Sequence, residues 1–337
     1  MFDYRQIGKT SLSVPRFGLG TAHLGGQVTR LSDEDSQATL NAAWNGGVRF
    51  YDSAPFYGRG LSEHRAGGFL LNKPRAEFVM TTKVGRVLHR PHDIASFRRS
   101  SWPGGLNFEI EFDYSYDGFM RSYEQSLMRL GLDTVDALLV HDLDANGHGG
   151  SFEWHVRNLR TSGMKALEQL KRSGDIKAIG MGINSAVSLE QVAPQVELDF
   201  VLVAMPYTLA DQSALHTGFA WCQRHGMSVV IGAPLASGIL ATGPGPNARY
   251  AYAPAPEEIQ TKVGAIQQVC RRHGVPLPAA ALQFPLAHPV VAAIIPGAAR
   301  ATEVEQNLAS MQVNIPADFW AELKAEGLID AEAPTPA

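Results

Sequence analysis

Cysteine is scarce in this chain, since only Cys222 and Cys270 occur among its 337 residues. Two cysteines cannot build a disulfide framework, and both lie in helix-like contexts, so we interpret them as free thiols. The sequence also lacks long hydrophobic runs, because no stretch reaches the roughly 18 apolar residues of a membrane span. The segment 1–5 is too charged for a signal peptide. We therefore expect a cytoplasmic protein without a membrane partner.

An excess of charge of one sign is missing as well. The 29 Lys and Arg residues are nearly balanced by 33 Asp and Glu residues, which gives a formal net charge of -4. Without a basic block, the chain is not expected to bind nucleic acid. Nucleophile motifs of the G-x-S-x-G type do not occur. The hydrophobic share of 45% is that of a globular protein with a large core. We expect a small-molecule substrate, and nothing in the sequence predicts an oligomeric state.

Short apolar runs of strand length are what the sequence does contain, and segments of helical period separate them. Many of these segments end in glycine, the residue that favours a left-handed helix C-cap. Repeated βα units build a parallel sheet, and eight of them close a (β/α)₈ TIM barrel of class α/β. We predict one barrel domain over residues 1–330 and a disordered tail over 331–337. The eight runs are 16–20, 48–54, 78–84, 136–141, 178–184, 200–206, 228–234 and 290–296.

The segments outside these repeats give further expectations. Residues 2–14 look like a β-hairpin that plugs the barrel floor. Ser32 and Ser62, each followed by a carboxylate, mark two helix starts. Two long loops, 86–117 and 144–157, follow strands at the C-terminal face of the barrel and are expected to shape a substrate pocket. The Pro/Gly/Ala-rich segment 242–256 is either a mobile flap or a tether.

Polar residues end three of the predicted strands. Asp52, Lys83 and His141 occupy these positions, and Tyr57 follows the first of them. In a (β/α)₈ barrel the C-terminal strand ends form the active-site face. A free tyrosine titrates near pH ~10, and a neighbouring ammonium favours its phenolate form. We therefore predict that Tyr57 is a general acid/base, that Lys83 lowers its pKa, and that Asp52 orients Lys83. His141 is expected to hydrogen-bond a substrate oxygen.

The same stretches carry a resemblance to a known family. The segment Phe50–Glu63, together with Thr81–Gly85 and Leu138–His141, resembles the aldo-keto reductase signature, and Ile176–Gly180 is similar to that family's fifth strand. The resemblance runs from about Tyr4 to Met311. It implies a barrel that binds a nicotinamide dinucleotide without a Rossmann domain. It also implies a catalytic tetrad of Asp52, Tyr57, Lys83 and His141, with Tyr57 as the proton donor or acceptor.

Further positions are assigned to the cofactor by this resemblance. Asn184 lies at the end of the fifth strand with altered spacing, and the sixth strand, Val203–Met205, lacks the glutamine usual there. The segment Ala233–Leu240 is similar to the loop that wraps the pyrophosphate. Ile295–Gly297 through Glu305–Asn307 is similar to the final cofactor segment. The implied cofactor-binding residues are Gly20, Thr21, Asp52, Asn184, Pro234, Leu235, Ser237, Gly238, Pro296, Gly297, Glu303, Gln306 and Asn307.

The final segment also bears on which dinucleotide binds. Members that prefer NADP usually carry Lys-Ser after the proline and an arginine six residues after that lysine. This chain has Gly297, Ala298 and Glu303 at those positions. A carboxylate at Glu303 would repel a 2′-phosphate and could accept a hydrogen bond from a 2′-hydroxyl, whereas Arg300 is a nearby cation that argues for NADP. We expect NAD to be preferred over NADP.

Two other motifs have competing interpretations. Gly18-Leu19-Gly20 with Gly25-Gly26 is a weak match to a dinucleotide fingerprint, because its third glycine is misplaced. His89-Arg90-Pro91-His92 could suggest a metal, but no further ligand follows in metal spacing, so we expect an ordinary loop and no metal.

The resemblance extends to the branch of the family that oxidises cyclic hemiacetals to lactones. The segments carrying it are 140–144, 180–184 and 206–212. The implied substrates are an aldose such as L-fucose or a D-threo-aldose, or pyridoxal. Tyr57 and His141 would contact the substrate, and Trp102 and Trp154 are candidates to stack on its ring. Alternatives are an NAD(P)H-dependent carbonyl reductase, a non-catalytic nicotinamide-binding barrel, and a metal-dependent barrel hydrolase or isomerase.

Overall fold

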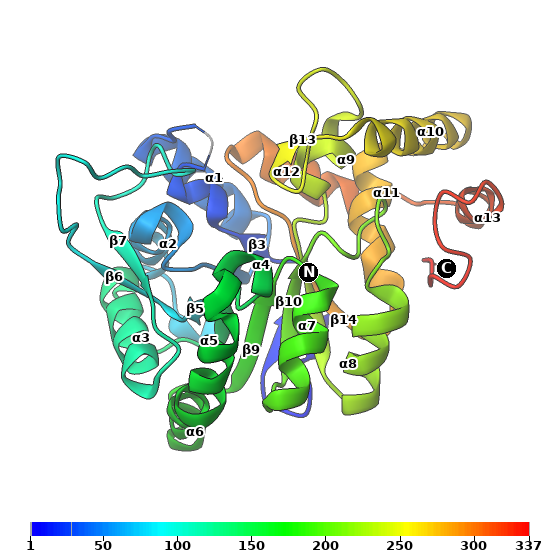
Figure 1. Cartoon of the computed structure of the whole chain (residues 1–337). Coiled ribbons are helices and arrows are strands. Elements are labelled where there is room, and N and C mark those ends of the chain that lie inside the picture. The colour runs from blue at the N-terminus through cyan, green and yellow to red at the C-terminus, as the bar shows by residue number, and fades with distance from the viewer. Residues whose placement is uncertain (1, 28, 337) are drawn as a thin grey trace.

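The computed structural model describes residues 2–27 and 29–336, and its centre is a sheet of eight parallel strands (Figure 1). The strands are largely buried, and most of them are rich in Val, Ile, Leu or Ala, as expected for strands covered on both faces. All eight predicted runs contain one of these strands. In chain order they are β3 (Leu19–Gly20), β4 (Phe50–Asp52), β5 (Val79–Val84), β8 (Ala137–His141), β9 (Ala178–Ile183), β10 (Phe200–Ala204), β11 (Ser228–Gly232) and β14 (Val291–Ile295).

The two ends of this sheet meet. Phe17 pairs with Ile294 and Gly20 pairs with Gly297, both in parallel. The backbone N–H of Gly18 donates to the carbonyl of Ile294 at 2.9 Å. The first and last strands are therefore joined, and the predicted (β/α)₈ barrel is confirmed.

Helices surround the barrel and return the chain to the start of each next strand (Figure 1). Gly131, Gly174 and Gly226 adopt the left-handed conformation at helix C-caps, as their positions in the sequence predict. The helices are α1 (Asp33–Asn45), α2 (Leu61–Leu70), α3 (Tyr116–Leu130), α4 (Ala145–His148), α5 (Phe152–Asn158), α6 (Met164–Ser173), α7 (Ala186–Val192), α8 (Ala220–His225), α9 (Ile239–Thr242), α10 (Glu257–His273), α11 (Leu277–Gln283), α12 (Ala301–Ser310) and α13 (Ala317–Ala325).

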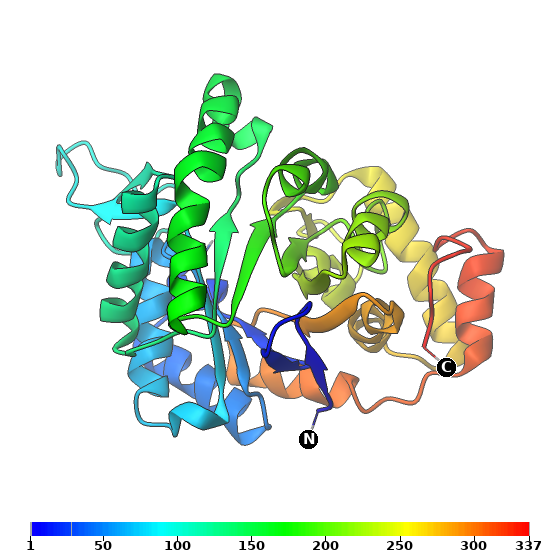
Figure 2. The same cartoon turned by 90° about the horizontal axis from the view of Figure 1, so that it is seen from below.

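The N-terminal hairpin consists of β1 (Tyr4–Gln6) and β2 (Ser13–Pro15), which pair in antiparallel fashion. Ile7, Leu12 and Val14 are buried in one apolar cluster with barrel residues that include Phe50 and Phe200. Figure 2 shows the hairpin lying across one end of the barrel. The predicted plug is therefore present, and it closes the end of the barrel opposite the C-terminal strand ends.

Four details differ from the expectations. The segment 86–117 is not a plain loop, because β6 (Arg86–His89) pairs with β7 (Glu109–Phe112) before α3 begins. The segment 144–157 is largely helical, and 242–256 contains the short pair β12 (Arg249–Tyr250) and β13 (Ala253–Pro254). The N-cap of α2 is Gly60, because Ser62 lies inside the helix and donates to the carbonyl of Thr21. The Ser32 cap is confirmed, since its side chain accepts from the N–H of Asp35.

The C-terminal tail also departs from expectation over its described part, residues 331–336. Ala333 is fully buried within the main apolar core, and its N–H donates to the carbonyl of Asp330. This part of the tail therefore packs against the domain instead of being disordered, and residue 337 lies outside the described residues. Among the described helices, none has the length and hydropathy needed to cross a membrane.

Candidate active site

The four predicted catalytic residues meet at the C-terminal face of the barrel. Asp52 ends β4, Lys83 lies one residue before the end of β5, and His141 ends β8. Tyr57 begins a short 3-10 turn, Tyr57–Gly60, that follows β4. Because β4, β5 and β8 are neighbours in the sheet, their final residues point three side chains into one region.

Lys83 and Asp52 form a buried ion pair. Lys83 Nζ lies 2.5 Å from Asp52 Oδ2 and donates to the carbonyl of Ser53 at 2.8 Å. Thr81 donates to the other carboxylate oxygen, Asp52 Oδ1, at 2.8 Å. Burial raises the pKa of Asp52, whereas the charge and hydrogen bonds of Lys83 oppose that shift. Since one partner alone would be an uncompensated buried charge, the two side chains hold each other in place.

Tyr57 lies next to this pair and next to His141. Lys83 Nζ is 4.7 Å from the centre of the Tyr57 ring, and the Tyr57 and His141 rings are 5.8 Å apart in an edge-to-face arrangement. Burial raises the pKa of Tyr57 well above its ordinary value, and the charges of Asp52 and Asp142 raise it further. The charge of Arg86 lowers the pKa of Tyr57, and the expectation that Lys83 also lowers it stays a prediction.

His141 is held in its neutral form. Burial lowers the pKa of His141 well below its ordinary value, and the charges of Arg86 and Lys83 act in the same direction. A neutral imidazole donates from one ring nitrogen and accepts at the other. At neutral pH the site therefore presents a phenol and a neutral imidazole side by side, two groups suited to binding one oxygen atom and exchanging a proton with it.

Two charged residues at this face were not anticipated from the sequence. Arg86, the first residue of β6, pairs with Asp142, which directly follows His141, at 2.7 Å. Asn184 donates to the other oxygen of Asp142 at 3.0 Å. The available signals were the position of Arg86 three residues after Lys83 and that of Asp142 after a strand end. Asn184, predicted to reach the cofactor, is therefore also tied to the substrate side of the site.

Aromatic residues surround the tetrad unevenly. The Trp102 ring, which is 1% exposed, lies 5.9 Å from the Tyr57 ring and 5.3 Å from that of Phe56, so the structure brings it to the site. Trp154 is 57% exposed and packs against His155 at 4.8 Å. The structure thus gives no support to Trp154 as a substrate contact. Trp102 lies between β6 and β7, on a loop that reaches back to the turn after β4, where Leu106 donates to the carbonyl of Gly58.

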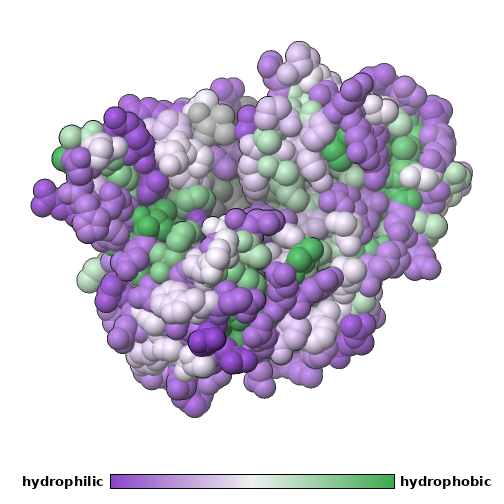
Figure 3. All heavy atoms as spheres, viewed as in Figure 1, coloured by the Kyte–Doolittle hydropathy of each residue, from purple (hydrophilic) through white to green (hydrophobic). Residues whose placement is uncertain are grey.

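Tyr252 is a further neighbour that the sequence did not reveal. It belongs to the turn between β12 and β13, where its φ is +64°, and its N–H donates to Ser237 Oγ at 3.0 Å. The Tyr252 residue is 46% exposed, but desolvation of its hydroxyl raises the pKa of Tyr252, and Tyr57 and Asp142 raise it further. In the space-filling view the surface is hollowed between the lobe formed around β6 and β7 and the lobe around α9 and α10 (Figure 3).

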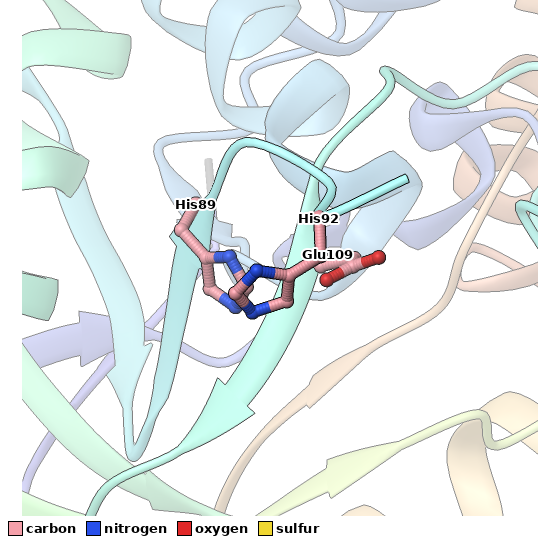
Figure 4. A group of neighbouring side chains, drawn as sticks. All are labelled: His89, His92 and Glu109. Atoms are coloured by element: carbon pink, nitrogen blue, oxygen red, sulfur yellow. The ribbon is translucent and has the colours of Figure 1, made fainter. Parts of the chain in front are cut away.

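A separate polar group lies on the β6–β7 hairpin (Figure 4). His89 and Glu109 are paired across the hairpin, and the ligating atoms of His89, His92 and Glu109 lie within 4.8 Å of one another. Glu109 is a third potential ligand that the spacing of the two histidines did not reveal. All three side chains are partly or fully exposed, and the acid–base centre does not include them.

Fold and site together define a (β/α)₈-barrel enzyme whose acid–base centre, built from a tyrosine, a histidine and a buried Lys–Asp pair, lies at the C-terminal face. The sequence matches the Aldo/keto reductase family over residues 16–326, so this chain belongs to that family. The protein is therefore an oxidoreductase, and its membership implies a nicotinamide cofactor.

Named relatives cover nearly the whole chain. It is 40% identical to pyridoxal 4-dehydrogenase from Microbacterium luteolum, over 97% of this chain and 98% of that protein. It is 38% identical to D-threo-aldose 1-dehydrogenase from a Pseudomonas species, over 96% of both chains. An aldo-keto reductase from Bacillus halodurans, solved in its holo form, has the same fold, with a TM-score of 0.75 at 23% identity over 99% of this chain and 98% of that chain.

The barrel brings most of the predicted cofactor segments side by side. Gly20 pairs with Gly297 and, on its other side, with Asp52. A Cβ at Gly297 would lie 2.5 Å from His23 Nδ1, so a side chain there would need this neighbour to move. Thr21 is fully buried, and its hydroxyl donates to the carbonyl of Asp52 and contacts Ser62. Because the Thr21 hydroxyl is already engaged, a ligand at this point of the barrel would contact the backbone of Gly20 and Gly297.

The strand next to β14 contributes the loop that carries Pro234, Leu235, Ser237 and Gly238. Ala233, Ala236, Ser237 and Gly238 all have positive φ, and the N–H groups of Ala236 and Gly238 donate to the carbonyls of Ala233 and Leu235 within the loop. The Ser237 hydroxyl is engaged by Tyr252. The loop is therefore tightly turned, and its contact with a pyrophosphate stays a prediction.

Helix α12 follows β14 and holds the remaining predicted cofactor residues. Asn307 is 7% exposed, and its side-chain amide takes part in none of the hydrogen bonds between described residues, so it is available to a ligand. Gln306 is exposed. Glu303 is exposed too, and its Oε2 accepts from the N–H of Ala299 at 2.7 Å, which fixes a negative charge at the start of the helix. The free Asn307 amide and the backbone around Gly20 and Gly297 fit the nicotinamide dinucleotide that family membership implies.

Proposed function

We propose that this protein oxidises the hydroxyl of a cyclic hemiacetal to a lactone, with NAD as the hydride acceptor. The substrate would be an aldose, such as L-fucose or a D-threo-aldose, or pyridoxal. The observation that carries the proposal is the meeting of Tyr57, His141 and the Lys83–Asp52 pair at one face of the barrel. Relatives at 40% and 38% identity that are named for pyridoxal and for an aldose support this substrate class.

In this proposal the protein's side chains handle the proton and orient the substrate. Tyr57 accepts the proton of the hemiacetal hydroxyl, and His141 donates a hydrogen bond to the same oxygen. When bound, an oxidised nicotinamide would supply the hydride acceptor. Burial raises the pKa of Tyr57, and the charge of Arg86 opposes that shift and favours the phenolate. Lys83 and Asp52 fix the position of the tyrosine.

Preference for NAD over NADP is a part of the same proposal. Support comes from Glu303, which stands where NADP-preferring members usually carry an arginine and whose carboxylate accepts from the N–H of Ala299. NADP binding would place like charges near each other, which is unfavourable. Arg300, the N-cap residue of α12, is exposed and is the cation that argues against this preference.

A panel of substrates tests the proposal directly. L-fucose, D-arabinose, pyridoxal and simple aldehydes are offered with NAD, NADP and their reduced forms, and the product is identified by mass. We expect NAD-dependent formation of a lactone. If only open-chain aldehydes react, and only by reduction, the enzyme is a carbonyl reductase and the proposal is wrong. If NADH binds but nothing turns over, the barrel is a non-catalytic binding subunit.

A further inference from the structure

Asp142 is the centre of a second polar group that adjoins the tetrad. Its Oδ2 lies 2.7 Å from a terminal nitrogen of Arg86 and 3.3 Å from His141 Nε2. Its Oδ1 accepts a hydrogen bond from Asn184 Nδ2 at 3.0 Å. One carboxylate therefore contacts three side chains, which come from the end of β8, the start of β6 and the segment after β9.

Arg86 and His141 are buried, Asp142 is partly buried and Asn184 is exposed, and the backbone of Asp142 is unusual. The Asp142 and Arg86 side chains are 17% and 9% exposed, and the Arg86 guanidinium packs on the Phe56 ring at 4.1 Å. Asp142 has a φ of +44°, in the left-handed region that few residues other than glycine adopt. Strained backbone of this kind persists where the surroundings over-determine it, often at functional sites. A surface ion pair would need neither this burial nor this backbone.

We propose that Asp142 is a positioning residue of the reaction: it holds the His141 imidazole with its proton on Nε2 and fixes the Asn184 amide, with Arg86 as its counter-ion. This inference rests on the proposed function, because it requires that His141 bind the reacting oxygen and that Tyr57 exchange the proton.

The choice of tautomer follows from the contacts of His141. His141 Nε2 lies 3.3 Å from Asp142 Oδ2 without a hydrogen bond between them, and the negative carboxylate favours a proton on the nitrogen that faces it. The other nitrogen, Nδ1, is buried and has no partner among the described residues, as suits an unprotonated nitrogen. With the tautomer reversed, Nε2 would present a lone pair to Asp142 and could not donate to a substrate oxygen.

Asn184 is oriented by the same carboxylate. Because its Nδ2 donates to Asp142, its side-chain carbonyl is directed away from Asp142 and can accept from the carboxamide of a nicotinamide. Asp142 therefore orients two side chains, His141 on the substrate side of the site and Asn184 on the cofactor side. Loss of the charge at Asp142 would affect both at once.

The two partners act on Tyr57 in opposite directions. The charged and titratable groups around Tyr57 are Asp52, Lys83, Arg86, His141, Asp142 and Tyr252. The charge of Asp142 raises the pKa of Tyr57, and that of Arg86 lowers it. Removing the charge of Asp142 should therefore lower the pKa of Tyr57, and removing the charge of Arg86 should raise it.

The test is the pH profile of kcat/KM for oxidation, measured with the best substrate of the panel deuterated at the carbon that loses hydride. We expect Asp142→Asn to reduce kcat about 10-fold. In the pH profile, kcat/KM should rise as Tyr57 loses its proton, and Asp142→Asn should move the midpoint of this rise to lower pH. Arg86→Gln should move the same midpoint to higher pH. Each shift should be on the order of one pH unit, and the double variant should return toward the parent. Glu326→Gln, which removes a remote carboxylate paired with Arg272, is the matched control and should shift nothing.

If the midpoints of Asp142→Asn and Arg86→Gln move in the same direction, or do not move, the role of Asp142 is overturned. The proposed function stays intact in that case, provided that Tyr57→Phe is inactive. Normal turnover by Tyr57→Phe would instead overturn the proposed function itself. If Asp142→Asn does not fold, Arg86→Lys and Arg86→Gln give the same test. Only Arg86→Gln removes the positive charge, so only this variant should move the midpoint of the pH profile to higher pH. Equal profiles for these two variants would contradict the inference.

Discussion

Tyr57 is the residue on which the proposed chemistry depends most directly. Tyr57→Phe removes the hydroxyl but keeps the ring beside Lys83 and Trp102. We expect kcat to fall by about 10² or more, the usual contribution of a positioned acid/base, while NADH still binds. Steady-state kinetics and the fluorescence of bound NADH measure the two effects. Tyr116→Phe is the control, because its hydroxyl bonds Gln169 at the surface. Turnover close to that of the parent would refute the assigned role.

Glu303 is the residue on which cofactor choice should depend. We expect NAD to exceed NADP at least ~10-fold in kcat/KM, which is about 1.4 kcal/mol of differential transition-state binding. Glu303→Arg should narrow this ratio by about 10-fold, because a cation would replace the carboxylate beside Ala299. Glu305→Arg, an equal charge change at another exposed position of α12, should leave the ratio nearly unchanged. An unaltered ratio in Glu303→Arg would show that Glu303 does not face the 2′ position.

At the scale of single residues, the sequence indicated the four members of the tetrad because each follows or ends an apolar run. It did not indicate that Tyr57 has a raised pKa. That direction comes first from burial by residues such as Trp102, which is far away in the chain, and then from the charges of Asp52 and Asp142. Arg86 and Asp142 were missed since each is unremarkable alone and acquires its setting only through the other.

The packing of α2 against α3 gives a prediction at the scale of elements. A Cβ at Gly67 would lie 2.2 Å from the carbonyl oxygen of Leu130, whereas one at Gly68 would meet nothing within 4 Å. Gly67→Ala should therefore destabilise the protein by about 1–3 kcal/mol through overpacking. Gly68→Ala, the matched control in the same helix, should stabilise it by up to about 1 kcal/mol. Urea denaturation of both variants measures the difference. If the two variants have the same unfolding free energy, α2 and α3 are not in the close contact described at Gly67.

Elements with regular apolar periods were predicted best, and segments between them least well. The hairpin of β6 and β7 escaped notice because β7 is polar and partly exposed, and β6 is a short strand that begins two residues after the end of β5. The same holds for β12 and β13, which consist of two residues each and position Tyr252. Ser62 has the sequence of a helix cap, yet its hydroxyl is used by Thr21 and Ser53 in the barrel.

At the scale of the whole molecule, stability and activity should be separable, because the plugged end of the barrel is opposite the tetrad. Leu12 is 2% exposed within the apolar cluster of the hairpin and the barrel interior. Leu12→Ala should cost about 2–4 kcal/mol of unfolding free energy, as large-to-small core changes do, with kcat nearly unchanged while the protein is folded. Leu71→Ala, at a position 60% exposed, is the control. A large loss of kcat in folded Leu12→Ala would show that the plug and the site are coupled.

The sequence by itself determined the number and order of the strands, the barrel, the hairpin plug and the face on which Asp52, Lys83 and His141 end their strands. These features depend on local periodicity and on a residue's place within a repeat, both of which can be read along the chain. Only the tertiary structure decided the pairing of Arg86 with Asp142, the bond of Asn184 to the same carboxylate, the exposure of Trp154 and the burial of Ala333. Contacts and pKa shifts depend on which distant residues become neighbours and on how much water they exclude, and neither is a local property of the sequence.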